Sequence, residues 1–203
     1  MELVESVQPY EEAKIRILNA THGCVAWAGT LKGLTFIHED MAVPQIRQMA
    51  HDYVTNDVIP CLNQPDHPSP IDLANYRDVV LERFGNPYVR DTNQRVASDG
   101  FTKISVFILP TIRERLERGQ SIASVARLPA LLLAVLERWH AGSLPIDYQD
   151  QVMTADVGHA ICTSTDPLAA FVRERSLWQD LVGNEDLYRA LKLAREALAR
   201  WDR

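Results

Sequence analysis

Residues 11–33, EEAKIRILNATHGCVAWAGTLKG, decide the fold predicted for this chain. The stretch reads as one long helix with two different faces. At about 100° per residue, Glu11, Lys14, Asn19 and His22 fall within an arc of roughly 140° on one side of the helix. The opposite side is apolar and carries Ala13, Ile17, Ala20, Cys24, Trp27, Ala28 and Leu31. A carboxylate, an amine, an amide and an imidazole therefore share one helix face.

This polar face has two interpretations. A polar row on a helix is most often a solvated surface, here with a salt bridge between Glu11 and Lys14. The separation of the faces is also imperfect, because Ile15, Leu18 and Val25 lean toward the polar side. Since apolar residues flank the row, we predict instead that it is half-buried and lines a cleft.

The composition limits the class of protein. The chain has 203 residues, of which 46% are hydrophobic, and this is enough for one domain with a real core. A net charge of -6 argues against nucleic acid as a partner. We expect no membrane span and no signal peptide, because no apolar run is long enough and the start of the chain is acidic. The three widely spaced cysteines fit reduced thiols in a cytoplasmic protein.

The rest of the chain is also predicted to be helical, so the expected fold class is mainly α. After the first helix, we predict helices over residues 44–57, 69–84, 91–118 with a break near Asp99-Gly100 and a kink at Pro110, 121–142, 166–175 and 184–201. We expect an extended entry over residues 1–10 ending at Pro9, a short strand or buried connection at 34–38, and a proline-rich loop at 60–70. Residues 143–166 are left unassigned.

Several sites are absent from the sequence. It contains no G-x-G-x-x-G, G-x-x-x-x-G-K-[ST] or G-x-S-x-G motif, so the chain offers no recognisable nucleotide site or nucleophile elbow. The six histidines do not form an H-E-x-x-H pair, and His38-Glu39-Asp40 is suggestive of a metal only by composition. Cys24 and Cys162 are interpreted as core residues, not nucleophiles.

The polar face of the first helix carries groups suited to proton transfer. A lysine such as Lys14 can act as a general base in a low-dielectric cleft, because burial disfavours its charged form. Asn19 can donate a hydrogen bond to an oxygen that gains negative charge. His22 can hold a hydroxyl or orient the amine, and Glu11 can pass protons to water. The residues alone leave both the catalytic and the solvated interpretation open.

Three stretches resemble one enzyme family. The pattern Lys14-x4-Asn19-x2-His22 resembles the signature of the polyol-specific long-chain dehydrogenases, a family that includes mannitol 2-dehydrogenase and fructuronate reductase. Residues 83–92, RFGNPYVRDT, are similar to its RF-x-NP segment. Arg95-x7-Lys103 is similar to a further segment with an arginine, an aspartate-glycine pair and a lysine. Within the family, residues 22–41 look most like the D-arabinitol 4-dehydrogenases.

The resemblance implies a multi-helix substrate-binding domain and a zinc-independent oxidation of a secondary alcohol, with hydride passing to NAD. It implies that Lys14 is the general base, that Asn19 polarises the reacting oxygen and that His22 binds and positions the substrate. Glu11 matches the acid expected just before the lysine and counts as a substrate-binding candidate.

The resemblance also implies that Arg95 and Lys103 contact hydroxyls of a small polyol or ketose. Two alternatives stay open for this pair. Both side chains can be ordinary surface charges, and Arg90 competes for the arginine role if the register differs.

One expected part of the family is missing from this chain. Family members carry an N-terminal nucleotide-binding domain of the Rossmann type, so we expect residues 1–203 to be a single helical domain corresponding to the C-terminal half. We therefore expect NAD to be bound mainly by the absent domain and this chain to be inactive alone. The cleft wall left exposed would favour self-association. The alternatives are a non-catalytic helical binding module and a metal-dependent hydrolase.

Overall fold

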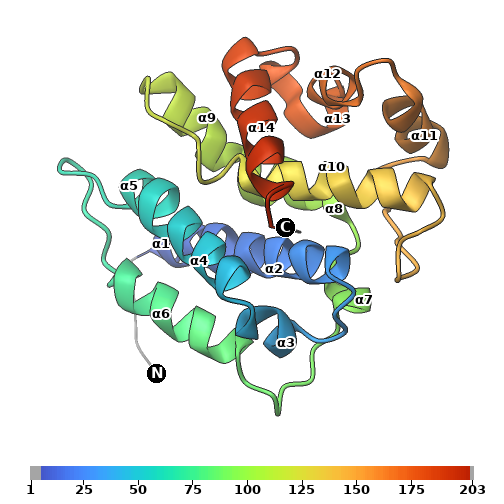
Figure 1. Ribbon diagram of the computed structural model, residues 1–203. Coiled ribbons are helices and arrows are strands. Elements are labelled where there is room, and N and C mark those ends of the chain that lie inside the picture. The colour runs from blue at the N-terminus through green and yellow to red at the C-terminus, as the bar shows by residue number, and fades with distance from the viewer. Residues whose placement is uncertain (1–5, 202–203) are drawn as a thin grey trace.

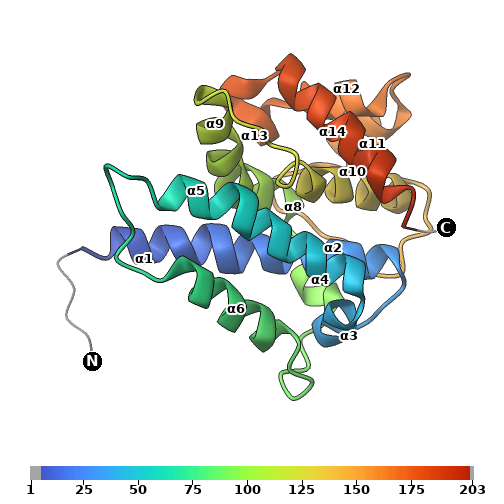
Figure 2. The same cartoon turned by 60° about the vertical axis from the view of Figure 1, so that its left-hand side comes forward.

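A helical rod from Gln8 to Leu31 runs through the middle of the molecule. In the computed structural model, which describes residues 6–201, the rod consists of α1 (Gln8–Ala13), a wider turn η1 (Lys14–Asn19) and α2 (Ala20–Leu31). Figures 1 and 2 show the rod in blue, with α4 and α6 packed along one side and α10 along another. The predicted first helix is confirmed, although it begins three residues earlier than expected.

The remaining elements surround this rod. In chain order they are α3 (Ile37–Ala42), α4 (Pro44–Tyr53), η2 (Val54–Val58), α5 (Ile59–Leu62), α6 (Leu73–Phe84), α7 (Asn93–Val96), α8 (Gly100–Thr102), η3 (Lys103–Ile108), α9 (Leu109–Glu117), α10 (Arg127–His140), α11 (Ala155–Thr163), α12 (Pro167–Val172), α13 (Arg175–Trp178), the 3₁₀ turn η4 (Gln179–Leu181) and α14 (Glu185–Leu198). Within residues 6–201 there are only isolated bridges and no β-sheet, so the mainly α class is confirmed.

The core surrounds the α2 part of the rod, where every residue from Ala20 to Thr30 except His22 is buried. Ile17, Ala20, Cys24 and Trp27 are all completely buried, as the helical period predicts. The indole N–H of Trp27 donates a hydrogen bond to the carbonyl oxygen of Ala97 at 2.8 Å. This bond fastens the middle of the chain to the rod, and it brings the segment around α7 close to the rod's polar side. Within the described part of the chain, the helices are all too short or too polar to cross a membrane.

Three elements contain π-helical turns, in which a backbone N–H bonds the carbonyl five residues earlier. In η1 the N–H of Ala20 bonds the oxygen of Ile15. The equivalent bonds in η2 and η3 run from Ile59 to Val54 and from Leu109 to Ile104. Such a turn holds one more residue than an α-helical turn, and it changes which side chains share a face. The regular helix predicted for residues 11–33 misses this feature.

Several predicted boundaries are wrong at prolines. Pro9 and Pro60 lie in the first turns of α1 and α5, whereas the sequence predicted an extended entry and a loop at these positions. Proline fits a first turn because the backbone N–H that it lacks has no intrahelical partner there. The predicted entry over residues 1–5 lies outside the described residues.

Other helix starts also differ from the prediction. Helix α6 begins after Asp72, whose side chain accepts from the N–H of Asn75, and not at the predicted cap Ser69. Helix α10 begins at Arg127 and not at Ser121. Two predicted N-terminal caps are confirmed: Asp166 caps α12, and Asn184 caps α14.

Candidate functional site

The rod presents Lys14, Asn19 and His22 on its solvent side. Lys14 is exposed, and Asn19 and His22 are half-buried, whereas Ala13, Arg16, Ile17, Ala20 and Thr21 between and beside them are buried. The wide turn η1 spans Lys14 to Asn19, and residues five apart lie nearly above one another in such a turn. His22 follows three residues later in the α-helical part. The structure therefore brings the three predicted residues to one side of the rod.

The imidazole of His22 is fixed on two sides. Its ring stacks on Phe84 of α6, with 4.6 Å between the ring centroids and 15° between the planes. Its Nε2 atom lies 3.2 Å from Oδ2 of Asp91. Burial lowers the pKa of His22 to about 4, and the charges of Arg95, Lys103 and Arg83 act in the same direction against the opposing pull of Asp91. The imidazole is therefore neutral at pH 7, and a proton on Nε2, the nitrogen nearer to Asp91, would leave Nδ1 as an acceptor.

Asp91 also binds Arg95. Its two carboxylate oxygens accept from Nε and Nη2 of Arg95 at 2.8 and 2.5 Å. This bond from Arg95 holds the pKa of Asp91 below its usual range. Sequence reasoning missed Asp91 as a site residue, although the spacing of four residues between Asp91 and Arg95 is a signal for such a pair.

Lys103 reaches the same place from η3. An added Cβ at Gly23 would lie 2.9 Å from Cδ of Lys103, so the aliphatic part of the lysine lies against the backbone next to His22. The ammonium group donates a hydrogen bond to the carbonyl oxygen of Ser98. Burial lowers the pKa of Lys103, and the nearby charge of Arg95 lowers it further. A glycine at position 23 is therefore what allows this lysine to approach His22.

The remaining predicted site residues are more exposed or lie in other contacts. Glu11 is exposed near the start of the rod, and no ion pair joins it to Lys14. Arg90 lies over the ring of Phe36, with 5.6 Å from its guanidinium carbon to the ring centroid, and no contact of Arg90 with His22 or Asp91 is seen. Arg95 is therefore the arginine that the structure places at His22, although 68% of its side chain is exposed. The face is open on this chain, and the cleft predicted around it stays a prediction.

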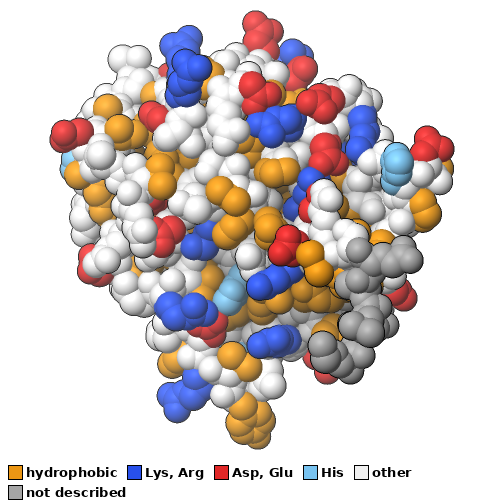
Figure 3. Space-filling model, turned by 180° about the vertical axis from the view of Figure 1, so that it is seen from behind, with side chains coloured by type: hydrophobic (Ala, Val, Ile, Leu, Met, Phe, Trp, Pro, Cys, Tyr) orange, Lys and Arg blue, Asp and Glu red, His pale blue; other side chains and the backbone are white. Residues whose placement is uncertain are grey.

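Figure 3 shows this side of the molecule, where Lys and Arg side chains surround a histidine and apolar side chains lie between them. The charges that act on His22 come from Arg83, Arg95 and Lys103, opposed by Asp91. Among residues 6–201, no three His, Cys, Asp or Glu side chains are grouped as metal ligands would be. The face is thus suited to hold a polar, hydroxyl-bearing molecule and to exchange a proton with it.

These features define a class: an all-helical domain with an amine, an amide and a neutral imidazole on one open face. The chain belongs to the mannitol dehydrogenase C-terminal domain family, whose model matches residues 6–199. Two relatives are called D-arabinitol 4-dehydrogenase. The protein from Ralstonia nicotianae is 56% identical over 200 residues, and the one from Klebsiella pneumoniae is 52% identical over 199 residues.

The similarity covers nearly all of this chain but a smaller part of each relative. It includes 98% of this chain and 42% of the length of either D-arabinitol 4-dehydrogenase. Among solved structures, the ternary complex of Pseudomonas fluorescens mannitol 2-dehydrogenase with NAD and D-mannitol superposes with a TM-score of 0.84 at 26% identity, covering 97% of this chain and 39% of that one. A substrate-free D-sorbitol dehydrogenase gives 0.82 at 26% identity, covering 98% and 40%.

Proposed function

We propose that this chain is the substrate-binding and catalytic-residue part of an NAD-dependent polyol dehydrogenase. The reaction is the zinc-independent oxidation of a secondary alcohol of a small sugar alcohol, of the D-arabinitol type, to a ketose. The observation that carries this proposal is that the residues suited to proton transfer lie on one face of a chain 56% identical to a D-arabinitol 4-dehydrogenase.

Each residue of the face has a role in the proposal. Lys14 takes the proton of the reacting hydroxyl as general base, and Glu11 near it passes that proton to water. The amide of Asn19 donates a hydrogen bond to the same oxygen, which gains negative charge as its proton leaves. The neutral His22, whose Nε2 proton is engaged by Asp91, accepts a hydrogen bond from a substrate hydroxyl at Nδ1.

The two basic side chains on the other side of His22 orient the substrate. Arg95 and Lys103 donate to further hydroxyls of the polyol, since each has N–H donors beyond those bound to Asp91 and Ser98. An open-chain polyol offers a hydroxyl on every carbon, so donors at both ends of the face fix which carbon stands at Lys14.

NAD is held elsewhere in this proposal. The chain has no glycine-rich loop of the kind that cradles dinucleotide phosphates, so a separate nucleotide-binding domain supplies that site. NAD held there would supply the acceptor for the hydride that leaves the carbinol carbon. The same domain covers the open face and removes water from the surroundings of Lys14. This chain alone is therefore inactive as a dehydrogenase.

The test is a chimera in which this chain replaces the corresponding 42% of the Ralstonia nicotianae relative. We expect NADH formation that depends on D-arabinitol. Lys14→Ala should lower kcat by about 10²- to 10⁴-fold, the usual contribution of a general base. Lys192→Ala, an exposed lysine of α14, is the matched control and should leave kcat unchanged. A folded chimera without polyol-dependent activity would favour the alternative of a non-catalytic binding module.

A further inference from the structure

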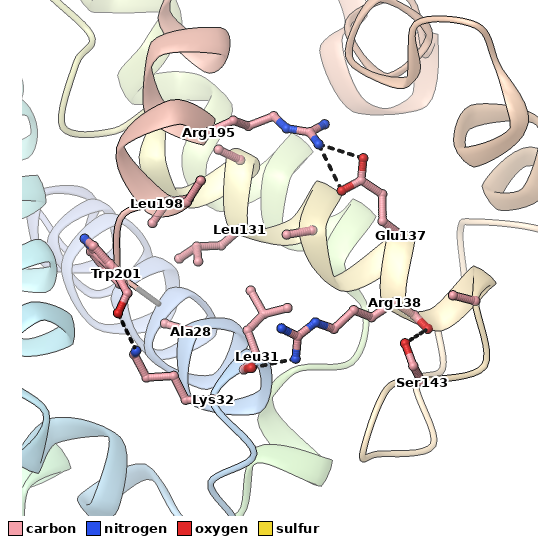
Figure 4. A pocket seen from close by; sticks show the side chains of 14 residues that line it. Ala28, Leu31, Lys32, Leu131, Glu137, Arg138, Ser143, Arg195, Leu198 and Trp201 are labelled. Atoms are coloured by element: carbon pink, nitrogen blue, oxygen red, sulfur yellow. Dashed lines mark hydrogen bonds and ion pairs between the residues drawn. The ribbon is translucent and has the colours of Figure 1, made fainter. Parts of the chain in front are cut away.

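A pocket lies on a different side of the rod from the candidate site. It is formed where the end of α2 meets α10 and α14, and its volume is about 350 Å³. Figure 4 shows side chains from all three helices pointing into this space. Pockets that hold small molecules in proteins begin at roughly 300 Å³. The pocket is therefore large enough for a small ligand, and none of the residues proposed for the dehydrogenase reaction line it.

The floor of the pocket is apolar. Ala28, Leu131, Ala134, Leu198 and Trp201 line it, and small alanines on α2 and α10 create the space. A sugar alcohol does not fit such a floor, because its hydroxyls would lose their hydrogen bonds to water without gaining partners. The floor suits an alkyl chain or an aromatic ring.

The wall of the pocket carries two arginines, Arg138 and Arg195. Among the described residues that line the pocket, one carboxylate, that of Glu137, stands beside them. Arg195 is neutralised by Glu137, with contacts of 2.7 and 3.0 Å. Arg138 instead donates one N–H to the carbonyl oxygen of Leu31 at 2.6 Å, and no carboxylate among the described residues pairs with it.

The bond to Leu31 also holds Arg138 in place. It satisfies a carbonyl at the end of α2, where the last turn of a helix has no intrahelical donors. Figure 4 shows the side chain of Arg138 extending from α10 along the edge of the pocket, with its guanidinium next to Leu31. A guanidinium has five N–H donors, so four remain for a ligand. A fixed guanidinium with free donors is a good receptor for a carboxylate, because little side-chain entropy is lost on binding.

We propose that this pocket binds a small amphipathic anion, a monocarboxylate with an apolar body, whose carboxylate pairs with Arg138. The apolar body lies on the alanine and leucine floor against Trp201. The site is independent of the proposed dehydrogenase function, since its residues come from the other end of the rod and from α10 and α14.

The test is isothermal titration calorimetry on this chain with octanoate, below its micelle concentration, and with octanol as the uncharged counterpart. We expect saturable one-to-one binding of octanoate. Arg138→Gln should weaken octanoate binding by about tenfold or more and change octanol binding by less than about twofold. Ala134→Phe fills the pocket and should abolish binding of both. Arg113→Gln, which removes an arginine bound to Asp180 on another surface, should change neither.

Circular dichroism melting of each variant separates a lost site from a lost fold, and Ala134→Phe keeps the proposal testable if Arg138→Gln does not fold. Two results would overturn the proposal. One is that octanoate does not bind saturably to the unaltered chain. The other is that Arg138→Gln weakens octanoate and octanol equally, which would mean that the guanidinium does not receive the carboxylate.

Discussion

Asp91 connects two of the proposed substrate-binding residues, because its carboxylate contacts Nε2 of His22 and accepts from Nε and Nη2 of Arg95. A neutral imidazole can carry its proton on either nitrogen, and the bonded partner decides which. The carboxylate therefore acts as a positioning group that keeps the Nδ1 lone pair of His22 available.

Replacement of Asp91 by alanine should change the tautomer of His22 in this chain. In the unaltered chain we expect imidazole ¹⁵N resonances at pH 7 that place the proton on Nε2. In Asp91→Ala the acceptor is gone, so both tautomers should be populated, and the pKa of His22 should fall further below about 4 because an attractive negative charge is lost. Asp180→Ala, which removes a surface partner of Arg113, is the control. A rise of the pKa toward 6.5 would contradict the assigned contact.

The site residues could be predicted to different extents. Lys14, Asn19 and His22 are close in sequence, so a helical period alone places them on one side. Asp91 and Lys103 reach His22 only through the packing of α7 and η3 against the rod, and no local pattern reports that packing. The roles of all these residues stay predictions, whereas the proximity of Asp91, Arg95 and Lys103 to His22 is a feature of the structure.

At the scale of elements, the helices were predictable but their wide turns were not. Both η2 and η3 are followed closely by a proline, Pro60 and Pro110, whose missing N–H and bulky ring disturb a regular helix. A wider turn just before the proline absorbs that disturbance, which the sequence predicted only as a loop start and a kink. No proline follows η1 within the rod, so its wide turn has no such local cause. Turns of this kind often occur at functional sites.

The contact of α3 with α2 depends on a buried carboxyl group. Asp40 of α3 is completely buried, and an added Cβ at Gly29 of α2 would lie 1.9 Å from its Oδ1 atom. That oxygen accepts a hydrogen bond from Asn93 of α7 at 3.0 Å, while Oδ2 has no partner among the described residues. Burial raises the pKa of Asp40 to about 7.

The contribution of Asp40 to the stability of the chain should therefore fall as the pH rises. Between about pH 4 and 7 the folded state keeps the proton on Asp40 while the unfolded state has released it, so this group increasingly favours unfolding across the window. Its contribution to the free energy of unfolding should decrease by on the order of 4 kcal/mol, whereas the lowered pKa of His22 acts in the opposite direction, so the effect is read from the difference between the unaltered chain and an Asp40 variant. Asp40→Asn, which cannot ionise, should lose this dependence and be more stable than the unaltered chain at pH 8.

Urea unfolding at pH 5 and pH 8 measures the effect. Asp156→Asn, an exposed residue of α11, is the matched control and should follow the unaltered chain at both values. If Asp40→Asn and the unaltered chain lose the same stability between the two pH values, then Asp40 does not titrate in this window and its buried carboxyl is not the source of the pH dependence.

At the scale of the whole molecule, the chain corresponds to 42% of the length of its D-arabinitol 4-dehydrogenase relatives. The sequence predicted the family and the helical class correctly, because both depend on local period and motif spacing. The pocket between α2, α10 and α14 could not be predicted, since its residues lie in three separate segments, 28–32, 130–143 and 195–201, which become neighbours only by folding.

If the proposed nucleotide-binding domain covers the Lys14 face, then its binding should protect that face from hydrogen exchange. The nucleotide-binding portion of the Ralstonia nicotianae relative, made as a separate chain and saturated with NAD, is the partner for this measurement. We expect slower amide exchange in the first half of the rod and in residues 83–103, because these segments surround His22. Helix α14 lies apart from this face in Figures 1 and 2, so its exchange should stay unchanged and serves as the internal reference.

The outcome also tests the order of events in the proposed function. A domain that covers the face must bind before Lys14 can work in a dry environment, so protection should appear even without a polyol. Addition of D-arabinitol should then slow exchange further only around His22, Arg95 and Lys103. Protection that appears on α14 instead of on the rod would place the partner at the other side of the molecule. The open face would then need a different explanation, and the general base assigned to Lys14 would lose its physical basis.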